Sequence, residues 1–231
     1  MNSLVLGIEH RAVEAGREPP PTGEVHLESG SASATLLTPT TIDPTRQYPL
    51  FTVLHGAGRQ DEMLVKACRD EPDRRDAFFL VPRSVETTWD LIVGGDRRDV
   101  DFLEYAYDLI YRRYPIDRAR QVLIGYSDGA SVALSLTISN PCIFDAALVW
   151  AAGFVMFDGT TVGPTDPKPR IYLEYGTHDE LFSYQQVALP MQENLTKAGY
   201  PVHFSTDEGG RHWPSKRFQP NALDWYFASD T

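Results

Sequence analysis

The pentapeptide Gly125-Tyr126-Ser127-Asp128-Gly129 constrains this chain more than any other stretch. Residues 121–124 before it are rich in β-forming side chains, and residues 130–138 after it favour a helix. A serine between two glycines, where a strand turns sharply into a helix, is the pattern of a nucleophile elbow. The glycines let a strained turn pass close to neighbouring backbone. The helix N-terminus behind the serine would direct N–H groups toward a developing oxyanion.

Length and charge limit the class of protein. The chain has 231 residues and a hydrophobic fraction of 42%, enough to bury the core of one α/β domain. Its net charge of −11 argues against a nucleic-acid partner, which needs a basic surface, and against binding to anionic membranes. We interpret the acidity as a source of solubility. No apolar stretch is long enough to span a bilayer, so membrane insertion is not expected.

The N-terminal region and the cysteines bear on organisation and location. We expect residues 1–23 to be peripheral, because the Pro-rich stretch 19–23 is a stiff spacer, and residues 24–231 to form one domain. The first residues lack the early positive charge of a signal peptide. Cys68 and Cys142 lack metal-site spacing, and we interpret them as small buried residues in a reducing, cytoplasmic setting, with one disulfide as the alternative. The oligomeric state stays open, a homodimer included.

Strand-like and helix-like segments alternate along most of the chain, which predicts a mainly parallel sheet with helices on both faces. Residues 101–104, Asp-Phe-Leu-Glu, resemble a capping box at the start of one helix, and residues 115–120 are predicted as a turn. The predicted strands are 24–28, 33–37, 50–54, 77–82, 121–124, 144–152, 170–176 and 201–206. The predicted helices are 62–69, 103–114, 130–138, 190–198 and 218–227.

A serine hydroxyl is a weak nucleophile and needs a base and an orienting acid. In a strand–elbow–helix arrangement these follow in the order serine, acid, histidine, on loops after later strands. Asp179 follows the predicted strand 170–176, and His212 lies in a glycine-rich loop after the last strand. We therefore assign Ser127 as the nucleophile, Asp179 as the acid and His212 as the base. His178 is the alternative base, and Glu174 and Asp158 are the alternative acids.

The stretch 55–58, His-Gly-Ala-Gly, follows a buried strand upstream of the elbow. Small residues there let backbone N–H groups approach a substrate oxygen, so the N–H groups of Ala57 and Asp128 are predicted to form an oxyanion hole. Gly58 is the alternative donor. Aromatic side chains near the predicted mouth are candidates for substrate binding, with core packing as the alternative for each: Trp89, Tyr126, Phe154, Phe182 and Trp213.

Taken together, these motifs resemble an α/β-hydrolase of the carboxylesterase, phospholipase and polyhydroxybutyrate-depolymerase-like group. The matching pieces span most of residues 50–215 in family order: 54–58, 89–90, 99–103, 116–122, 125–130, 176–179 and 209–214. Depolymerase members commonly carry Asn-Gly-Gly after the nucleophile, and this chain differs there, with Asp128-Gly129-Ala130. The resemblance implies the α/β-hydrolase fold, a Ser-Asp-His triad and no metal or organic cofactor.

The expected function is hydrolysis of carboxylic esters with small to medium acyl or aryl groups, through an acyl-enzyme. The chain is short and offers no obvious inserted lid, which predicts an open cleft for a small-molecule ester. Two alternatives remain. One is a catalytically silent ligand-binding protein on the same fold, and the other is an amidase or peptidase.

Overall fold

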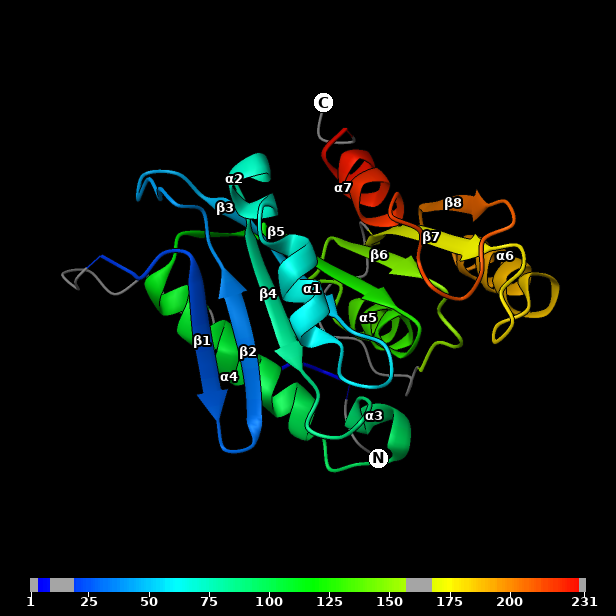
Figure 1. Cartoon of the computed structure of the whole chain (residues 1–231), viewed down its shortest axis with the longest axis horizontal. Coiled ribbons are helices and arrows are strands. Elements are labelled where there is room, and N and C mark those ends of the chain that lie inside the picture. Colours follow the sequence, from blue (N-terminus) through cyan, green and yellow to red (C-terminus); the bar gives the residue numbers. More distant parts are fainter. Residues whose placement is uncertain (1–3, 9–18, 157–167, 229–231) are drawn as a thin grey trace.

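The computed structural model describes residues 4–8, 19–156 and 168–228, and an eight-stranded sheet runs through them (Figure 1). The strand order is β1-β2-β4-β3-β5-β6-β7-β8. β1 pairs with β2 and β2 with β4 in antiparallel fashion, while the remaining neighbours pair in parallel. The bounds are β1 (Glu24–Ser29), β2 (Ala32–Leu37), β3 (Tyr48–Leu54), β4 (Phe78–Arg83), β5 (Ile116–Tyr126), β6 (Ala146–Trp150), β7 (Arg170–Gly176) and β8 (Val202–Asp207).

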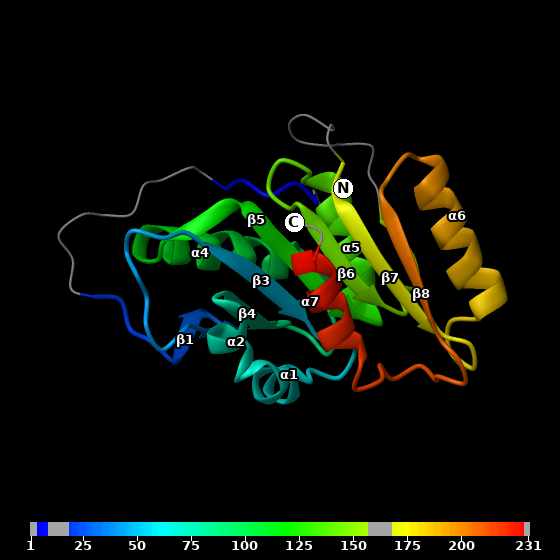
Figure 2. The ribbon, with the colours of Figure 1, turned by 90° about the horizontal axis from the view of Figure 1, so that it is seen from above.

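Helices cover both faces of the sheet, as Figure 2 shows. One layer contains α1 (Asp61–Cys68), α2 (Glu71–Arg75) and α7 (Phe218–Ala228), and the other contains α4 (Arg98–Arg113), α5 (Asp128–Ser139) and α6 (Leu189–Lys197). The short α3 (Asp90–Val93) packs against α4 and α5. A π-helical turn, Tyr184–Ala188, leads into α6, whose first turn holds Pro190 because that position needs no N–H donor. The predicted architecture, a mainly parallel sheet between helices, is confirmed.

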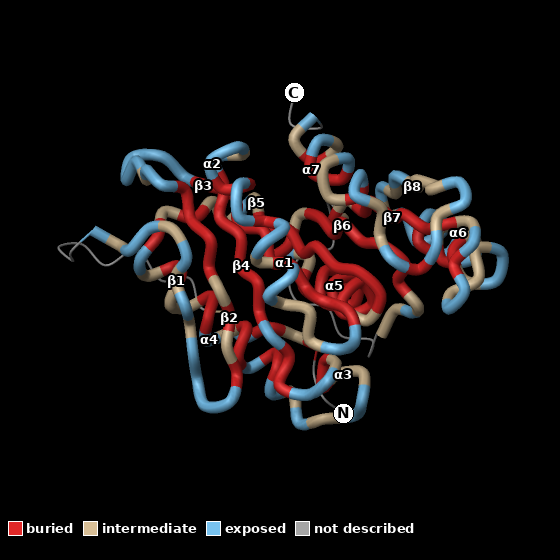
Figure 3. The backbone as a smooth tube through the Cα atoms, in the orientation of Figure 1, coloured by how far each residue is buried: buried red, intermediate tan, exposed pale blue. Residues whose placement is uncertain are grey.

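The central strands form the core (Figure 3). All residues of β3 and β6 are buried, which explains why their sequences are nearly continuous apolar runs. Helix α5 is also buried along residues 129–139. Its Ser131 and Ser135 hydroxyls accept the N–H groups of Gly153 (2.9 Å) and Met156 (2.8 Å). These two bonds hold the chain that follows β6 alongside α5.

Two local predictions are wrong. Helix α4 begins at Arg98, before the predicted capping box, and the Glu104 carboxylate accepts the N–H of Gly7 (2.7 Å) instead of reaching back to Asp101. The predicted turn 115–120 belongs mostly to β5, because Ile116 pairs with Tyr48 and an irregularity in register lets the strand continue. In both cases a partner distant in sequence decided the local conformation.

Part of the N-terminal region packs into the protein. Leu4 and Leu6 are only 3% exposed and belong to the core, which differs from the peripheral placement expected for residues 1–23. The Asn140 side chain, at the end of α5, accepts the N–H of Leu6 (2.8 Å) and donates to the carbonyl of Leu4 (2.9 Å). Buried amide groups of this segment are thereby satisfied.

Three further expectations can be compared with the structure. Cys68 and Cys142 are both free thiols, Cys68 buried but Cys142 exposed, where burial of both was expected. No helix among the described residues has the length and apolar character needed to cross a membrane. Residues 157–167, between β6 and β7, lie outside the described part of the chain. The expectation that the chain has no inserted lid concerns these residues too, and so it stays a prediction.

Candidate active site

Ser127 stands at the junction of β5 and α5, in a conformation that few residues adopt. Its backbone angles are φ 54° and ψ −124°, and its N–H donates to the Trp150 carbonyl at 2.9 Å, which ties the turn to β6. A Cβ atom at Gly125 would lie 2.3 Å from the Gly129 oxygen, and one at Gly129 would lie 2.3 Å from the Leu54 oxygen. Both glycines are therefore required by close backbone contacts, as the sequence predicted.

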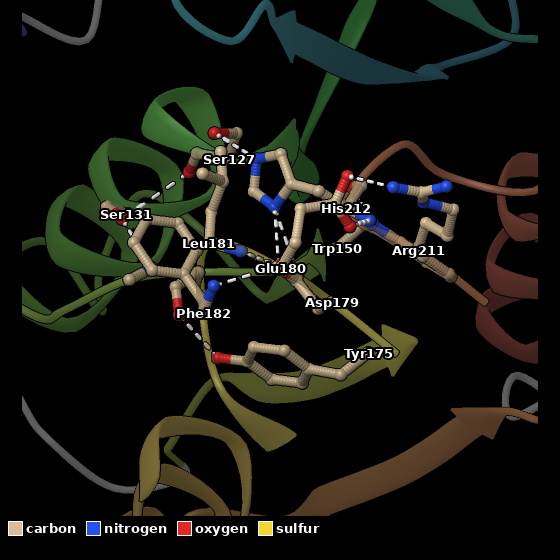
Figure 4. A network of polar contacts seen from close by, with 12 residues as sticks. Ser127, Ser131, Trp150, Tyr175, Asp179, Glu180, Leu181, Phe182, Arg211 and His212 are labelled. Atoms are coloured by element: carbon tan, nitrogen blue, oxygen red, sulfur yellow. Dashed lines mark hydrogen bonds and ion pairs between the residues drawn. The ribbon is translucent and has the colours of Figure 1, made fainter. Parts of the chain in front are cut away.

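A chain of hydrogen bonds joins Ser127 to His212 and His212 to Asp179 (Figure 4). The Ser127 Oγ lies 2.8 Å from His212 Nε2, and His212 Nδ1 lies 3.0 and 3.1 Å from the two Asp179 oxygens. Because a carboxylate only accepts, Nδ1 carries the ring proton and Nε2 turns its lone pair toward the serine hydroxyl. The three side chains come from the ends of β5, β7 and β8, at one edge of the sheet.

Backbone and aromatic contacts hold the histidine and the carboxylate in place. Asp179 Oδ1 accepts the N–H groups of Leu181 and Phe182, both at 2.8 Å. The indole N–H of Trp150 donates to the His212 carbonyl at 2.8 Å, and the Phe182 ring meets the His212 ring edge-on at 5.3 Å. These contacts restrict the rotation of both side chains before any substrate arrives.

The alternative bases and acids are placed differently. His178 is exposed, and its backbone N–H donates to the Gly210 carbonyl, so it belongs to the turn that carries Asp179. Glu174 accepts the Tyr172 hydroxyl at 2.6 Å, and burial raises the pKa of this carboxyl group. Asp158 lies outside the described residues. The structure therefore brings together the three side chains that sequence reasoning preferred.

Backbone groups of the 55–58 loop lie beside the elbow. The N–H of Gly58 is engaged, donating to the Thr87 carbonyl at 2.8 Å. Within the described residues the N–H of Ala57 has no recorded acceptor, and the N–H of Asp128, at the first position of α5, has no intrahelical acceptor. Ala57 and Asp128 therefore have N–H groups available for an oxyanion, whereas Gly58 does not.

Two polar side chains that sequence reasoning missed support this loop. Gln60 donates to the Ala57 carbonyl and accepts the Tyr126 hydroxyl at 2.9 Å. Thr88 donates its hydroxyl to the Asp128 carboxylate at 2.6 Å, which joins the loop after β4 to the elbow. A single glutamine or threonine in a polar loop forms no recognisable pattern, so the sequence offers no signal for either.

The five aromatic candidates differ in how far their side chains are exposed. Trp213 and Phe154 are 57% and 38% exposed, and Trp213 contacts the mostly buried ring of Tyr126 at 5.8 Å. Phe182 is partly buried beside His212. Trp89 is only 1% exposed, so it does not line an open cleft in this structure. Its ring packs on His55 and its N–H donates to the His55 carbonyl at 2.8 Å, which satisfies a buried indole.

A cavity of about 540 Å³ is lined by residues of α5, of α6 and of the chain that follows β6. Its lining is mostly apolar and includes Ile138, Gly153, Val155, Met191 and Leu195. The Phe182 ring packs directly on Gly153, since a Cβ atom there would lie 2.5 Å from Phe182 Cζ. Phe182 therefore contacts both His212 and Gly153, one of the residues that line this cavity.

A buried pair of carboxyl groups lies near the 55–58 loop. Asp99 accepts the N–H groups of Val85 and Asp90, both at 2.7 Å, and Asp90 is fully buried. Burial, together with the charge of Asp90, raises the pKa of Asp99 to about 6. Because the pKa in the folded protein exceeds the ordinary value of 3.8, the protonated carboxyl is favoured by folding.

Asp99→Asn is expected to gain stability relative to the wild type as the pH rises. The contribution of Asp99 is fully present below the unfolded pKa and is lost as the pH rises through about 6, whereas asparagine stays neutral. The unfolding free energy of the variant minus that of the wild type should increase by up to about 3 kcal/mol between pH 4 and 7.5. Urea denaturation across this range measures the shift, and the exposed Asp101→Asn is the control. A difference that does not change with pH would contradict the assignment.

This chain is similar to known proteins in its structure only. No family model matches the sequence, and no curated protein matches it. A thermostable esterase superposes with a TM-score of 0.68 at 18% identity, over 89% of this chain, and the chain spans only 62% of that esterase. The Bacillus cereus carboxylesterase gives 0.62 at 21% identity over 84% of this chain and 93% of that one. Esterase 2 of the planctomycete Thermogutta terrifontis gives 0.66 at 14% identity over 92% and 93%. The chain therefore has the α/β-hydrolase fold that these esterases share.

Proposed function

We propose that this protein is a serine hydrolase that cleaves carboxylic esters through an acyl-enzyme. The observation that carries the proposal is the hydrogen-bonded chain Ser127–His212–Asp179 beside two N–H groups, those of Ala57 and Asp128, that have no acceptor among the described residues. The esterases with the same fold add support at the level of the fold.

In the proposed reaction Ser127 Oγ attacks the ester carbonyl carbon while His212 Nε2 takes the hydroxyl proton. The carbonyl electrons move onto oxygen, and the N–H groups of Ala57 and Asp128 stabilise that oxyanion. Asp179 stabilises the imidazolium, which then gives its proton to the departing alkoxide as the C–O bond breaks. Water, deprotonated by His212, attacks the acyl-enzyme and releases the acid and the free serine. These steps use no metal or organic cofactor.

The side chains around Ser127 favour apolar substrates of small to medium size. Trp213, Phe154 and Leu181 are exposed apolar groups on the loops around the site, and they can pack against acyl or aryl groups. The cavity that Gly153 lines could hold a longer acyl chain only if that chain passed the Phe182 ring, which packs on Gly153. We therefore propose small to medium acyl or aryl esters as the substrate class.

A panel of p-nitrophenyl esters from acetate to decanoate tests the proposal. We expect turnover of the short esters and a fall in kcat/KM once the chain exceeds the space in front of Phe182. Binding of esters without turnover would support a silent binder. Hydrolysis of a matched p-nitroanilide at a rate near that of the ester would support an amidase or peptidase.

Asp179→Asn is expected to lower kcat by about 10⁴ with little change in KM, because the amide stabilises the wrong imidazole tautomer. Stopped-flow or steady-state hydrolysis of p-nitrophenyl acetate measures the loss. Glu180→Gln is the control, since this neighbouring carboxylate contacts the His212 backbone N–H (3.3 Å) and Arg211 and not the imidazole ring nitrogens. Activity near the wild-type level in Asp179→Asn would move the acid role to Asp158 or Glu174.

A further inference from the structure

The side chain of His55 is held in a single protonation state. It is fully buried, and its Nε2 lies 3.1 Å from the backbone nitrogen of Ser84. A backbone N–H can only donate, so Nε2 accepts and carries no proton. Burial lowers the pKa of His55, which favours the neutral ring. The ring proton therefore sits on Nδ1, which donates to the Gly56 carbonyl at 2.6 Å.

This bond controls the direction of a neighbouring N–H. The Gly56 carbonyl and the Ala57 N–H belong to one planar peptide unit and point in opposite directions. A ring that holds the Gly56 oxygen on one side therefore holds the Ala57 N–H on the other. Glycine at position 56 makes rotation of this peptide easy, so the unit needs an external restraint.

The peptides on either side are restrained as well. The indole N–H of Trp89 donates to the His55 carbonyl at 2.8 Å, and its ring stacks on the His55 ring at 4.7 Å. The N–H of Gly58 donates to the Thr87 carbonyl at 2.8 Å. The Gly56–Ala57 peptide lies between these two restrained peptides, and the His55 ring donates to its carbonyl oxygen.

We propose that His55 is a positioning residue of the oxyanion hole, acting through its Nδ1–H bond to the Gly56 carbonyl. This inference rests on the proposed function. If the peptide rotates, the Ala57 N–H turns away and the Gly56 carbonyl oxygen faces the developing negative charge. Loss of one oxyanion donor lowers kcat by about 10²–10³, so loosening it through His55→Ala should lower kcat by about 10–10². KM should change little, because the ester ground state carries no full charge on oxygen.

Two substitutions separate positioning from packing. In His55→Asn the amide nitrogen is as many bonds from Cα as Nδ1, so it can donate to the Gly56 carbonyl. In His55→Gln the amide lies one bond further out, near Nε2, where it can accept from Ser84 but not reach Gly56. We expect asparagine to restore most of the kcat lost in His55→Ala, and glutamine to restore little. His26→Ala, an exposed histidine on β1, is the control.

The second measurement is the affinity for a trifluoromethyl ketone, which forms a tetrahedral oxyanion on the serine. Its Ki should weaken by the same factor as kcat/KM in His55→Ala and His55→Gln. Titration of active sites corrects for misfolded protein. Trp89→Phe, which loses the indole bond and part of the ring that stacks on His55, replaces any His55 variant that does not fold. In that variant a smaller loss of kcat is expected.

Equal activity of the glutamine and asparagine variants, or a change confined to KM, would overturn the role of His55. Unchanged kcat and Ki in Trp89→Phe, where the His55 variants do not fold, would also overturn it. If the wild type hydrolyses no ester, the proposed function itself fails. If the wild type hydrolyses esters and the variants match it, only this inference fails.

Discussion

Ser127→Ala is expected to lower kcat on an activated ester such as p-nitrophenyl acetate by about 10⁵–10⁶. The substitution removes the oxygen that lies 2.8 Å from His212 Nε2 and leaves the backbone bonds of the elbow in place. The variant should therefore unfold at nearly the wild-type temperature. Steady-state hydrolysis and thermal unfolding measure the two quantities on the same preparation.

A matched control lies one turn further along α5. Ser131 is buried and binds the Gly153 N–H, so Ser131→Ala should lower stability while leaving kcat per folded molecule within about tenfold. Activity above about a tenth of the wild-type rate in Ser127→Ala would show that Ser127 is not the nucleophile.

His212→Ala is expected to reduce kcat to a similar extent, by about 10⁵–10⁶, because nucleophile and base act as one unit. Steady-state hydrolysis of p-nitrophenyl acetate, corrected for spontaneous hydrolysis, measures the loss.

His178→Ala is the control for the base, because His178 is exposed on the turn before Asp179. This variant should keep the wild-type rate. An inactive His178→Ala beside an active His212→Ala would reverse the assignment. If neither substitution matters and no ester is hydrolysed, the chain is better interpreted as a ligand-binding protein on a hydrolase scaffold.

Local sequence patterns were sufficient for the framework and for the three polar side chains at its edge. The strand Arg170–Gly176 has the predicted bounds, and β3 and β6 are the buried runs that continuous apolar sequence indicates. Ser127, Asp179 and His212 could be selected because each follows a strand, and parallel strands bring their carboxyl ends to one edge. The glycines around Ser127 reflect steric contacts that act over a few residues or against the adjacent strand.

Features that depend on distant partners could not be predicted. Trp89 was a candidate for substrate binding with core packing as the alternative, and only its buried hydrogen bond to the His55 carbonyl places it in the core. Asp101 and Glu104 have the spacing of a capping box, yet Glu104 binds the N–H of Gly7, which the chain brings back from the N-terminus. Sequence spacing describes neighbours along one element, whereas these contacts join separate elements.

The 55–58 loop shows most clearly what the sequence predicts and what depends on the tertiary structure. The sequence by itself predicted that the stretch His-Gly-Ala-Gly after a buried strand would present small residues beside the elbow, with Ala57 as the expected donor and Gly58 as the alternative. The tertiary structure distinguishes their N–H groups, because the Thr87 carbonyl, on the loop after β4, accepts the N–H of Gly58, and this favours Ala57 in the proposed oxyanion hole. A backbone N–H is identical in every residue except proline, so its availability depends on which acceptor the fold brings next to it.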